Sequence, residues 1–229
     1  MLMKRILMLL LATMALTTVV VSGVALAQVI EGTNAGETLN GTNNPDLIKA
    51  FGGPDTINAK DAADELRAGG GNDKAYGENG NDTYYGGSGD DQLNEYGGID
   101  PLPSDGPSHT GKDVMFGGDG IDTLEGGDNA DELHGGPNTG TTFRDFLFGD
   151  PGNDKLYGED GPDYLEGEQG SDLMSGGGGN DLIDAANQES LFGTDTVNCG
   201  SGLHDEVTAN ENDTVFDNCE DVTRVADRG

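Results

Sequence analysis

The sequence contains no tryptophan, and only 6% of its 229 residues are aromatic. Hydrophobic residues make up 33% of the chain, and many of them lie in the segment 1–27. The rest of the sequence therefore offers little apolar surface to offset the conformational entropy that folding removes. We expect that the chain does not fold as an ordinary globule and that it depends on a further stabilising interaction.

Basic residues are also scarce, with 11 Lys and Arg against 43 Asp and Glu, so the formal net charge is −32. A chain with this charge repels phosphate groups instead of displacing their counterions. The charge balance therefore excludes nucleic acid and anionic membrane surfaces as partners and favours cations.

Sequence signatures of common enzymes are missing. The sequence has no H-E-x-x-H zinc motif and no G-x-S-x-G nucleophile motif. Its three histidines, His109, His134 and His204, are far apart in the sequence. We expect that the protein is not an enzyme and that it has no catalytic residues.

The N-terminal segment 1–27 has the organisation of a secretory signal peptide. Two basic residues precede an uncharged run over residues 6–21, and the triplet Ala-Leu-Ala over residues 25–27 forms a small-x-small cleavage site before Gln28. An uncleaved membrane anchor is the alternative, because residues 6–27 are nearly long enough to span a bilayer. We expect cleavage, no further membrane span, and a bacterial protein that is secreted or held at the cell surface.

The two cysteines, Cys199 and Cys219, both lie near the C-terminal end of the sequence. An even number of cysteines in an exported chain suggests a disulfide bond, with two unrelated thiols as the alternative. A disulfide at this place would close the end of the fold. We therefore assign residues 199–229 to degenerate repeats and a C-terminal cap.

A nine-residue repeat runs through the chain from residue 32 onwards. Residues 149–184 show it as four consecutive nonamers with Gly at positions 1 and 4, Asp at position 6 and a large apolar residue at position 8. Insertions interrupt the period near residues 104–107, 135–139 and 185–189, as surface loops of a repeat protein do. The acids at position 6 are Glu37, Asp46, Asp55, Asp64, Asp73, Asp82, Asp91, Asp100, Asp113, Asp122, Asp131, Asp145, Asp154, Asp163, Asp172, Asp181, Asp195, Asp205 and Asp213.

The apolar residue at position 8 predicts a very short strand with one inward side chain, because successive side chains of a strand point to opposite faces. The six residues before it must turn the chain, and glycine permits the backbone conformations with positive φ that such turns require. Alternating turns and strands predict an all-β fold, a parallel β-solenoid of about 19 repeats with two repeats per coil. We assign residues 28–198 to it.

This pattern resembles the RTX, or haemolysin-type, calcium-binding repeat, whose consensus is G-G-x-G-x-D-x-U-x, where U is a large apolar residue. The resemblance covers residues 32 to about 216 and implies a calcium-filled parallel β-roll. Calcium takes six to eight oxygen ligands, which carboxylates and backbone carbonyls supply. The metal ligands that the resemblance implies are Asp73, Asp82, Asp91, Asp100, Asp113, Asp122, Asp131, Asp145, Asp154, Asp163, Asp172 and Asp181, with Asp46, Asp55, Asp64 and Asp195 as weaker candidates.

The resemblance also implies that each ion lies between two turns that are two repeats apart, so that about 17 ions are the upper bound. Without cations, carboxylates at strand spacing repel one another, so we expect a disordered metal-free chain and a folded calcium-bound chain. The implied neighbours are Asp73 with Asp91, Asp82 with Asp100, Asp154 with Asp172, and Asp163 with Asp181.

These features predict a secreted or cell-surface calcium-binding protein with a structural, adhesive or matrix role, whose partner at the surface stays open. One alternative is calcium-dependent ice binding, although position 7 carries no sustained row of Thr. Another is a glycan-binding adhesin module. The outward aromatic residues Tyr76, Phe116 and Tyr157 lie in every fourth repeat by this count, so they would lie on the same sheet and could contact a glycan. An accessory segment of a hydrolase or toxin is a more remote alternative.

Overall fold

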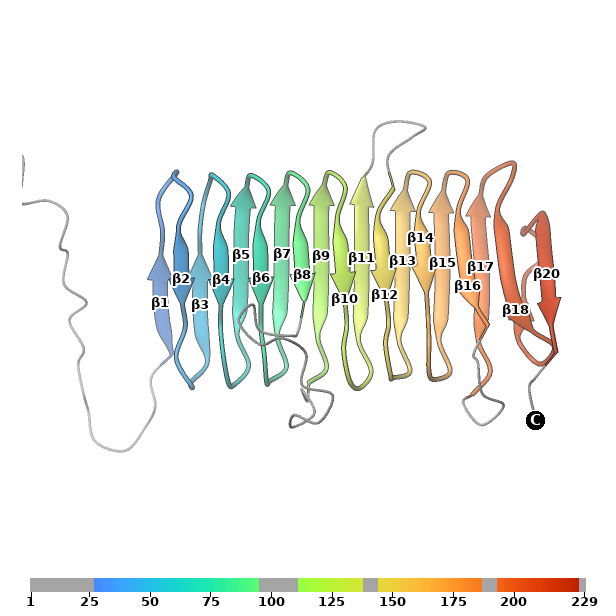
Figure 1. The fold of residues 1–229 in the computed structure, drawn as a ribbon, viewed down its shortest axis with the longest axis horizontal. Coiled ribbons are helices and arrows are strands. Elements are labelled where there is room, and N and C mark those ends of the chain that lie inside the picture. The colour runs from blue at the N-terminus through green and yellow to red at the C-terminus, as the bar shows by residue number, and fades with distance from the viewer. Residues whose placement is uncertain (1–26, 95–110, 138–143, 187–192, 227–229) are drawn as a thin grey trace, which may run out of the picture.

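The structure, a computed structural model (Figure 1), describes residues 27–94, 111–137, 144–186 and 193–226. These residues form twenty strands joined by turns, and the expected all-β class is confirmed. Among these residues there is no helix of the length and apolarity needed to cross a membrane. The predicted signal peptide, residues 1–27, lies outside the described residues except for Ala27.

The strands form two parallel sheets of ten strands each. The odd sheet contains β1 (Gln28–Glu31), β3 (Asp46–Lys49), β5 (Glu65–Gly70), β7 (Thr83–Ser88), β9 (Val114–Asp119), β11 (Glu132–Pro137), β13 (Lys155–Asp160), β15 (Leu173–Gly178), β17 (Thr196–Ser201) and β19 (Thr214–Val215). The even sheet contains β2 (Thr38–Asn40), β4 (Thr56–Asn58), β6 (Lys74–Tyr76), β8 (Gln92–Asn94), β10 (Thr123–Glu125), β12 (Phe146–Phe148), β14 (Tyr164–Glu166), β16 (Leu182–Ala185), β18 (Glu206–Asn210) and β20 (Asp221–Val225).

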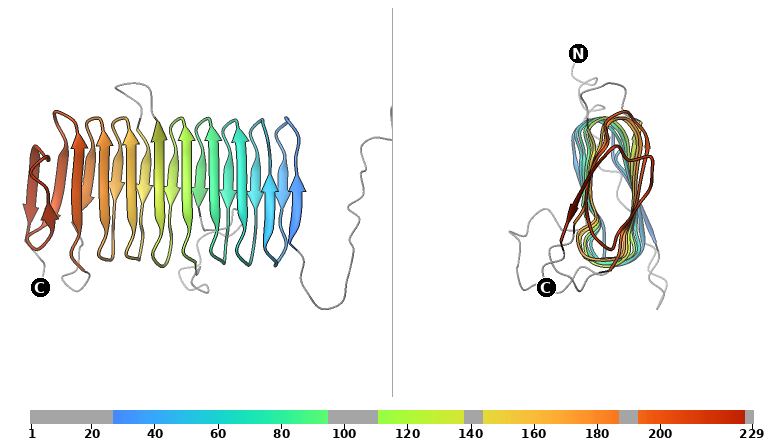
Figure 2. Two further views of the ribbon diagram at one scale, coloured as in Figure 1. Left: turned by 180° about the vertical axis from the view of Figure 1, so that it is seen from behind. Right: turned by 90° about the vertical axis from the view of Figure 1, so that its right-hand side faces the viewer.

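The register of the strands confirms the predicted coil of two repeats. Gln28 pairs with Asp46 in the odd sheet, and Thr38 pairs with Thr56 in the even sheet, so that each strand meets the strand two repeats further along the chain. One odd strand and one even strand therefore complete one coil. Seen along its axis in Figure 2, the stack of coils has the outline of a flattened ring.

The core of the solenoid is built mainly from one large inward side chain per strand, at position 8, with small side chains such as Ala68, Ala185 and Cys199 buried beside it. These position-8 side chains stack on one another along each sheet, as Leu124 and Leu147 do between β10 and β12. All interior members of the series are at most 2% exposed: Ile48, Ile57, Leu66, Ala75, Tyr84, Leu93, Met115, Leu124, Leu133, Leu147, Leu156, Leu165, Met174, Ile183, Val197 and Val207. Such a narrow core explains why a chain with so few apolar residues can form it.

The insertion between β8 and β9 is larger than expected. Thr83 of β7 pairs directly with Val114 of β9, a much wider separation in sequence than the two repeats that join regular neighbours. β7 and β9 are therefore direct neighbours. The repeat predicted over residues 95–103, with Asp100, lies outside the described residues.

The other two insertions begin later than expected. Residues 135–137 belong to β11, because Gly135 and Gly136 fill positions 1 and 2 of a repeat, and Ala185 is the last residue of β16. Beyond the insertion after β11 the ladder resumes in register, since Thr123 of β10 pairs with Phe146 of β12. Beyond the insertion after β16 it does so again, since Leu173 of β15 pairs with Thr196 of β17. The parallel pairing therefore continues past each insertion.

Each end of the solenoid has a strand that the repeat count did not include. Ile30 of β1 stacks on Ile48, and Val222 of β20 stacks on Val207. Their position-6 residues are Gln28 and Glu220, and the absence of Asp at both places hides these repeats in the sequence. Both sheets run past residue 199 without interruption, and the assignment of residues 199–229 to a cap stays a prediction.

The outward aromatic residues lie on two different sheets. Phe116 and Tyr157 lie on the odd sheet, where their rings and those of Tyr85 and His134 stack in the order Tyr85, Phe116, His134, Tyr157, with centroids 5.4, 4.7 and 4.8 Å apart. Tyr76 belongs to β6 of the even sheet. The expectation that Tyr76 shares a face with Phe116 and Tyr157 is wrong. The repeat count places one repeat in the long insertion between β8 and β9, and without that repeat Tyr76 and Phe116 belong to different sheets.

The turns depend on positive φ angles at positions 2 and 4 of the repeat. Gly118 and Gly120 have φ of 108° and 145°, and a Cβ at either residue would overlap a carbonyl oxygen of the preceding coil. The repeat before Asp64 lacks these glycines but keeps the same backbone, with φ of 89° at Lys60 and 98° at Ala62. These two residues therefore hold a conformation that L-amino acids disfavour.

We predict that Ala62→Gly raises the free energy of unfolding by about 1 kcal/mol, because the relief of left-handed strain exceeds the entropy cost of a glycine. The measurement is denaturant unfolding in excess calcium. Ala63→Gly is the matched control, because Ala63 has no positive φ, and it should lower the stability by about 0.5–1 kcal/mol. Equal losses for both variants would contradict the assignment of strain to Ala62.

Candidate metal centre

Each repeat buries the carboxylate at position 6, where the turn enters the strand. The aspartates from Asp46 to Asp205 in the described series are all at most 4% exposed. Aspartate is seldom buried this deeply without a partner of opposite charge. In the part of the chain that the structure describes, the ion pairs with basic side chains are formed by other acids, namely Glu31, Glu65, Glu132 and Glu159. The charge of the buried aspartates must therefore be compensated in another way.

One oxygen of each carboxylate bonds to the coil before it. The backbone N–H of Asp73 donates to Oδ1 of Asp91 at 2.8 Å, and the N–H of Asp91 donates in turn to Oδ1 of Asp122 at 2.7 Å. The same bond recurs along both edges of the roll, in one ladder from Gln28 to Asp213 and in another from Glu37 to Glu220. Each acid is thereby fixed in position by the neighbouring coil.

These ladders show which acids are neighbours. Three of the expected pairs are direct neighbours. They are Asp73 with Asp91, Asp154 with Asp172, and Asp163 with Asp181. The expected pairing of Asp82 with Asp100 is wrong. The N–H of Asp82 donates to Oδ1 of Asp113, because β7 pairs directly with β9.

The second carboxylate oxygen, Oδ2, is buried without a hydrogen-bond donor in most repeats. A buried acceptor with no partner costs free energy, and an ionised one costs more. This oxygen is therefore the atom that requires a cation. Oδ2 is buried and without a hydrogen bond in Asp55, Asp64, Asp73, Asp82, Asp91, Asp113, Asp122, Asp131, Asp154, Asp172, Asp181 and Asp205.

The glycine at position 1 leaves a cradle beside this oxygen. A Cβ on Gly117 would lie 2.5 Å from Asp122 Oδ2 and 2.6 Å from the carbonyl oxygen of Gly135 in the next coil. At Gly149 the same two kinds of atom, Asp154 Oδ2 and the Gly167 carbonyl oxygen, lie at 2.8 and 2.9 Å. The missing side chain thus brings a carboxylate oxygen and a carbonyl oxygen of the adjacent coil to one place.

This donor set fits calcium. It consists of oxygens alone, and calcium prefers carboxylate and carbonyl oxygens. Within the described residues, no group of three or more His, Cys, Asp or Glu side chains is placed to hold a metal ion. The carboxylates therefore require backbone carbonyls to complete a ligand set, and carbonyls suit calcium better than the softer transition metals.

Burial makes these carboxylates resist ionisation when no metal is bound. Burial, together with the charges of the neighbouring carboxylates Asp145 and Asp91, raises the pKa of Asp122 to about 8, against the hydrogen bond from the Asp91 backbone. For the same main reason the pKa of Asp113 rises to about 8 and that of Asp154 to about 9. At neutral pH the ionised roll therefore needs a cation to be stable.

The acids near both ends are satisfied by the protein itself. Thr42 donates from its backbone N–H and its hydroxyl to Asp46 Oδ2 at 2.7 and 3.0 Å, and Thr33 does the same for Glu37 at 2.8 and 2.6 Å. At the other end the Asn210 N–H donates to Asp213 Oδ2 at 2.7 Å. A threonine at position 2 is the sequence signal that could have identified the first two cases.

The ligand prediction for the remaining residues stays a prediction, although the structure places them. All of its described members occupy position 6 of the ladder, and Asp55, Asp64 and Asp195, the weaker candidates, are as buried as the others. Asp205 was not predicted as a ligand, yet its Oδ2 is also buried without a donor. Asp205 follows Asp195 by one residue more than the nine-residue period, and this irregular spacing concealed it as a ligand candidate.

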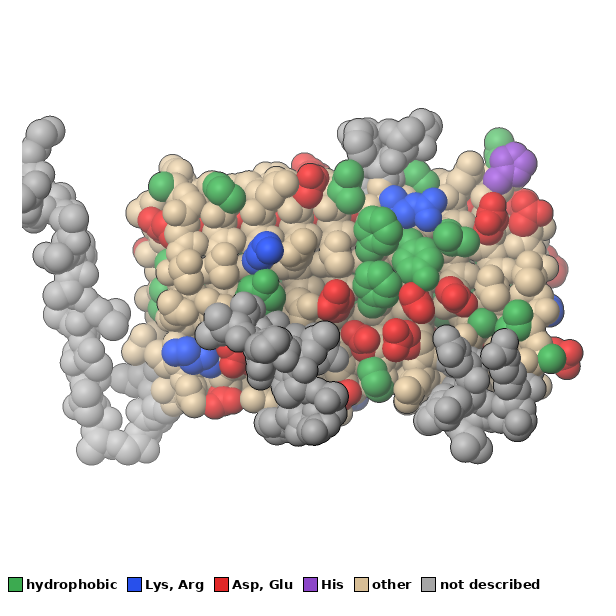
Figure 3. Space-filling model, viewed as in Figure 1, with side chains coloured by type: hydrophobic (Ala, Val, Ile, Leu, Met, Phe, Trp, Pro, Cys, Tyr) green, Lys and Arg blue, Asp and Glu red, His purple; other side chains and the backbone are tan. Residues whose placement is uncertain are grey.

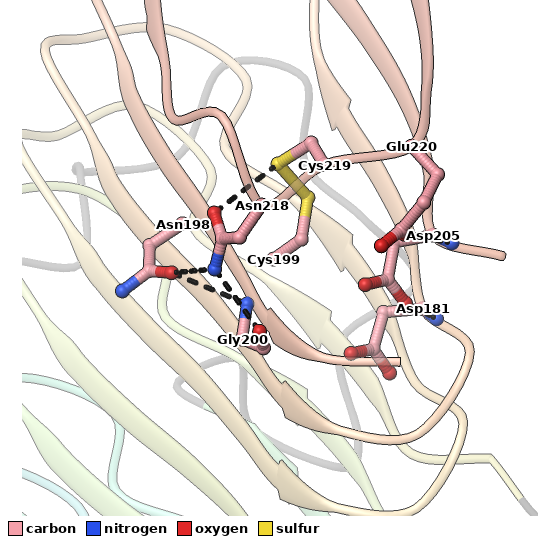
Figure 4. Close-up of a disulfide and its surroundings, with 8 residues drawn as sticks. All are labelled: Asp181, Asn198, Cys199, Gly200, Asp205, Asn218, Cys219 and Glu220. Carbon is pink, nitrogen blue, oxygen red and sulfur yellow. Dashed lines mark hydrogen bonds between the residues drawn. A yellow bond between two sulfur atoms is a disulfide. The ribbon is translucent and has the colours of Figure 1, made fainter. Parts of the chain in front are cut away.

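The predicted disulfide between Cys199 and Cys219 is present (Figure 4). It joins β17 to the segment before β20, where Asn218 donates to Asn198 Oδ1 at 2.7 Å and to the Gly200 carbonyl at 3.0 Å. The acid ladder passes beside it, because the N–H of Asp205 donates to Glu220 at 3.1 Å. The disulfide therefore anchors the last coil to the coil before it.

Comparison with protein families agrees with this geometry. A family described as RTX calcium-binding nonapeptide repeat (4 copies) matches residues 31–64, 59–93, 109–138, 139–174 and 157–188, which together make up more than half of the chain. No curated protein matches the chain.

We predict that Asp122→Asn lowers the number of calcium ions bound per chain, because it removes the charge from an oxygen without a donor. Asp46→Asn is the matched control, since both of its oxygens already accept hydrogen bonds, and it should leave the number of ions unchanged. Elemental analysis of the dialysed variants measures both. Loss of ions from both variants to the same extent would contradict the distinction.

The pH dependence follows from the raised pKa values. In the unfolded chain an aspartate titrates near 3.9, whereas in the metal-free roll the pKa is about 7 for Asp91 and Asp131 and about 8 for Asp122. The folded state therefore binds more protons over this interval, and the metal-free chain loses stability as the pH rises through about 7–8. Circular dichroism in chelator should show more β-structure at pH 5 than at pH 9, and a folded chelated chain at pH 9 would contradict this.

Proposed function

The chain belongs to the RTX calcium-binding nonapeptide repeat family, and from this premise we propose that it is an exported structural or adhesive protein whose β-roll folds when it binds calcium. Calcium binding is the function that the repeats of this family carry. The observation that supports the rest of the proposal is the row of buried carboxylate oxygens that have no donor.

Coupling between calcium binding and folding follows from the cost of burying these oxygens. Bound calcium would supply the positive charge that each Oδ2 lacks. The chain contributes the fixed Asp carboxylates, the cradles at the position-1 glycines and the carbonyls of the adjacent coil. In the unfolded chain no such sites exist, so the binding free energy is available only to the folded state.

The number of ions is set by the acids that have no protein donor. Acids whose Oδ2 has no donor, such as Asp55, Asp122 and Asp205, lie in the interior of the series, whereas Glu37, Asp46 and Asp213 near its ends accept hydrogen bonds from Thr33, Thr42 and Asn210. We therefore place the calcium sites in the interior coils and expect fewer than the upper bound of about 17 that the repeat count allows.

An extracellular role is supported by the signal-like segment 1–27, by the disulfide and by the calcium requirement. Millimolar calcium outside the cell would saturate sites that stay empty at cytosolic concentrations. A non-catalytic role is supported by the family, which is a calcium-binding repeat rather than an enzyme. The Thr row that ice binding would need breaks at Lys74, which pairs with Thr56.

The proposal predicts that the chain beginning at Gln28 is largely disordered in chelator and forms β-structure on addition of millimolar calcium. Circular dichroism and calorimetry, combined with a count of bound ions, should show a cooperative transition with many ions per chain. Sodium chloride at equal ionic strength is the control for charge screening. A spectrum that is the same in chelator and in calcium would refute coupled folding.

A further inference from the structure

The outer face of the even sheet carries an apolar patch beside a row of carboxylates. Phe146, Tyr164 and Leu182 are direct neighbours across β12, β14 and β16, and Phe148 lies two residues after Phe146 on β12. We call these four residues the aromatic patch. In Figure 3 hydrophobic side chains gather on this face, and a row of acidic side chains lies directly beneath them.

The strand register identifies the acidic row. Phe148 pairs with Glu125 on one side and with Glu166 on the other, and Glu166 pairs with Asp184. Neighbouring strands are about 4.8 Å apart, so these carboxylates lie within reach of one another and of the Phe148 ring. We call Glu125, Glu166 and Asp184 the acidic row.

The rings of the patch are tilted against one another, unlike the stacked rings of the odd sheet. On the odd sheet the rings of Phe116 and His134 are nearly parallel, at 18°, so that each covers a face of the other. On the even sheet the ring planes of Phe146 and Phe148 are tilted by 49° and 57° against Tyr164. Phe146 is 36% exposed. Part of the Phe146 ring is therefore accessible for packing, next to the half-buried rings of Phe148 and Tyr164.

The electrostatic environment of the patch favours positive charge. Burial, together with the charges of Glu125, Asp128 and Glu166, raises the pKa of Asp150 to about 6, against one backbone hydrogen bond. Burial also raises the pKa of Glu168, and the charges of Asp150 and Glu166 add to this rise. Arg144, two residues before Phe146, is the basic residue closest in sequence, at the end of the patch away from the acidic row. The carboxylates thus repel one another, and a cation would relieve this repulsion.

We propose that the aromatic patch and the acidic row form a docking site for a cationic, amphipathic segment of a partner protein. Its apolar side chains pack on the ring faces of Phe146, Phe148 and Tyr164, and its Lys or Arg side chains pair with the acidic row and lie over the rings. A second copy of the chain does not suit this site, because it would place a second acidic row against the first, and like charges repel.

The test uses the full chain in saturating calcium, with a short synthetic peptide of Lys, Leu and Trp as the probe and oligolysine of the same charge as the comparison. The variant Phe146→Ser/Phe148→Ser leaves the charge unchanged and should weaken peptide binding about tenfold or more, without changing oligolysine binding. The variant Glu125→Gln/Glu166→Gln should weaken both. Tyr85→Ser/Phe116→Ser on the odd sheet is the matched control and should bind like the original chain.

Several outcomes would overturn the inference. Equal peptide affinity of the original chain and Phe146→Ser/Phe148→Ser would show attraction by net charge alone. Absence of peptide binding, or binding of cellulose or chitin oligosaccharides that this variant loses, would also overturn it. Circular dichroism in calcium separates this inference from the proposed function on which it rests, because a folded chain without patch-dependent binding refutes only the docking site, whereas a chain that calcium does not fold refutes both.

Discussion

The structure depends on one buried carboxylate per turn, of which one oxygen accepts a hydrogen bond from the preceding coil and the other, in most repeats, has no donor. The bonded oxygen, Oδ1, holds the backbone of the preceding coil, while Oδ2 faces a glycine that has no side chain to cover it. This arrangement explains the composition of the chain. The glycines make room and the acids supply charge. The apolar residues fill only a narrow core, and under the proposed function cation binding supplies stability that a wider core would otherwise provide.

The regular part of this arrangement could be predicted from the sequence, because the strands and the hydrogen-bonded acids both repeat every nine residues. The nine-residue spacing of Asp and the apolar residue two places later define the strand, its inward side chain and the coil. The irregular parts depend on hydrogen bonds that spacing does not reveal. The segment with Asp100 continues the period, yet the ladder joins Asp82 to Asp113, and Gln28 and Glu220 complete coils without the expected aspartate.

The acids at position 6 also differ along the roll in their hydrogen-bond donors, although nearly all of them are aspartate. Asp46 and Asp122 have the same side chain, the same position in the repeat and nearly the same burial. A threonine four residues before Asp46 satisfies its second oxygen, whereas Asp122 has glycine at the equivalent place. The first coils can therefore hold their shape with protein donors, and the interior coils depend on cations. Under the proposed function, we therefore expect the roll to be most sensitive to calcium in its middle.

Because of the parallel register, the number of coils determines the length of the solenoid. Whether two paired strands are separated by 18, 23 or 31 residues, they stay adjacent in the same sheet. An insertion between paired strands therefore adds no strand to the sheet, while each complete coil adds about 4.8 Å to its length. A sheet of ten strands is therefore about 43 Å long from its first to its last strand. The length of the solenoid can change only by whole coils.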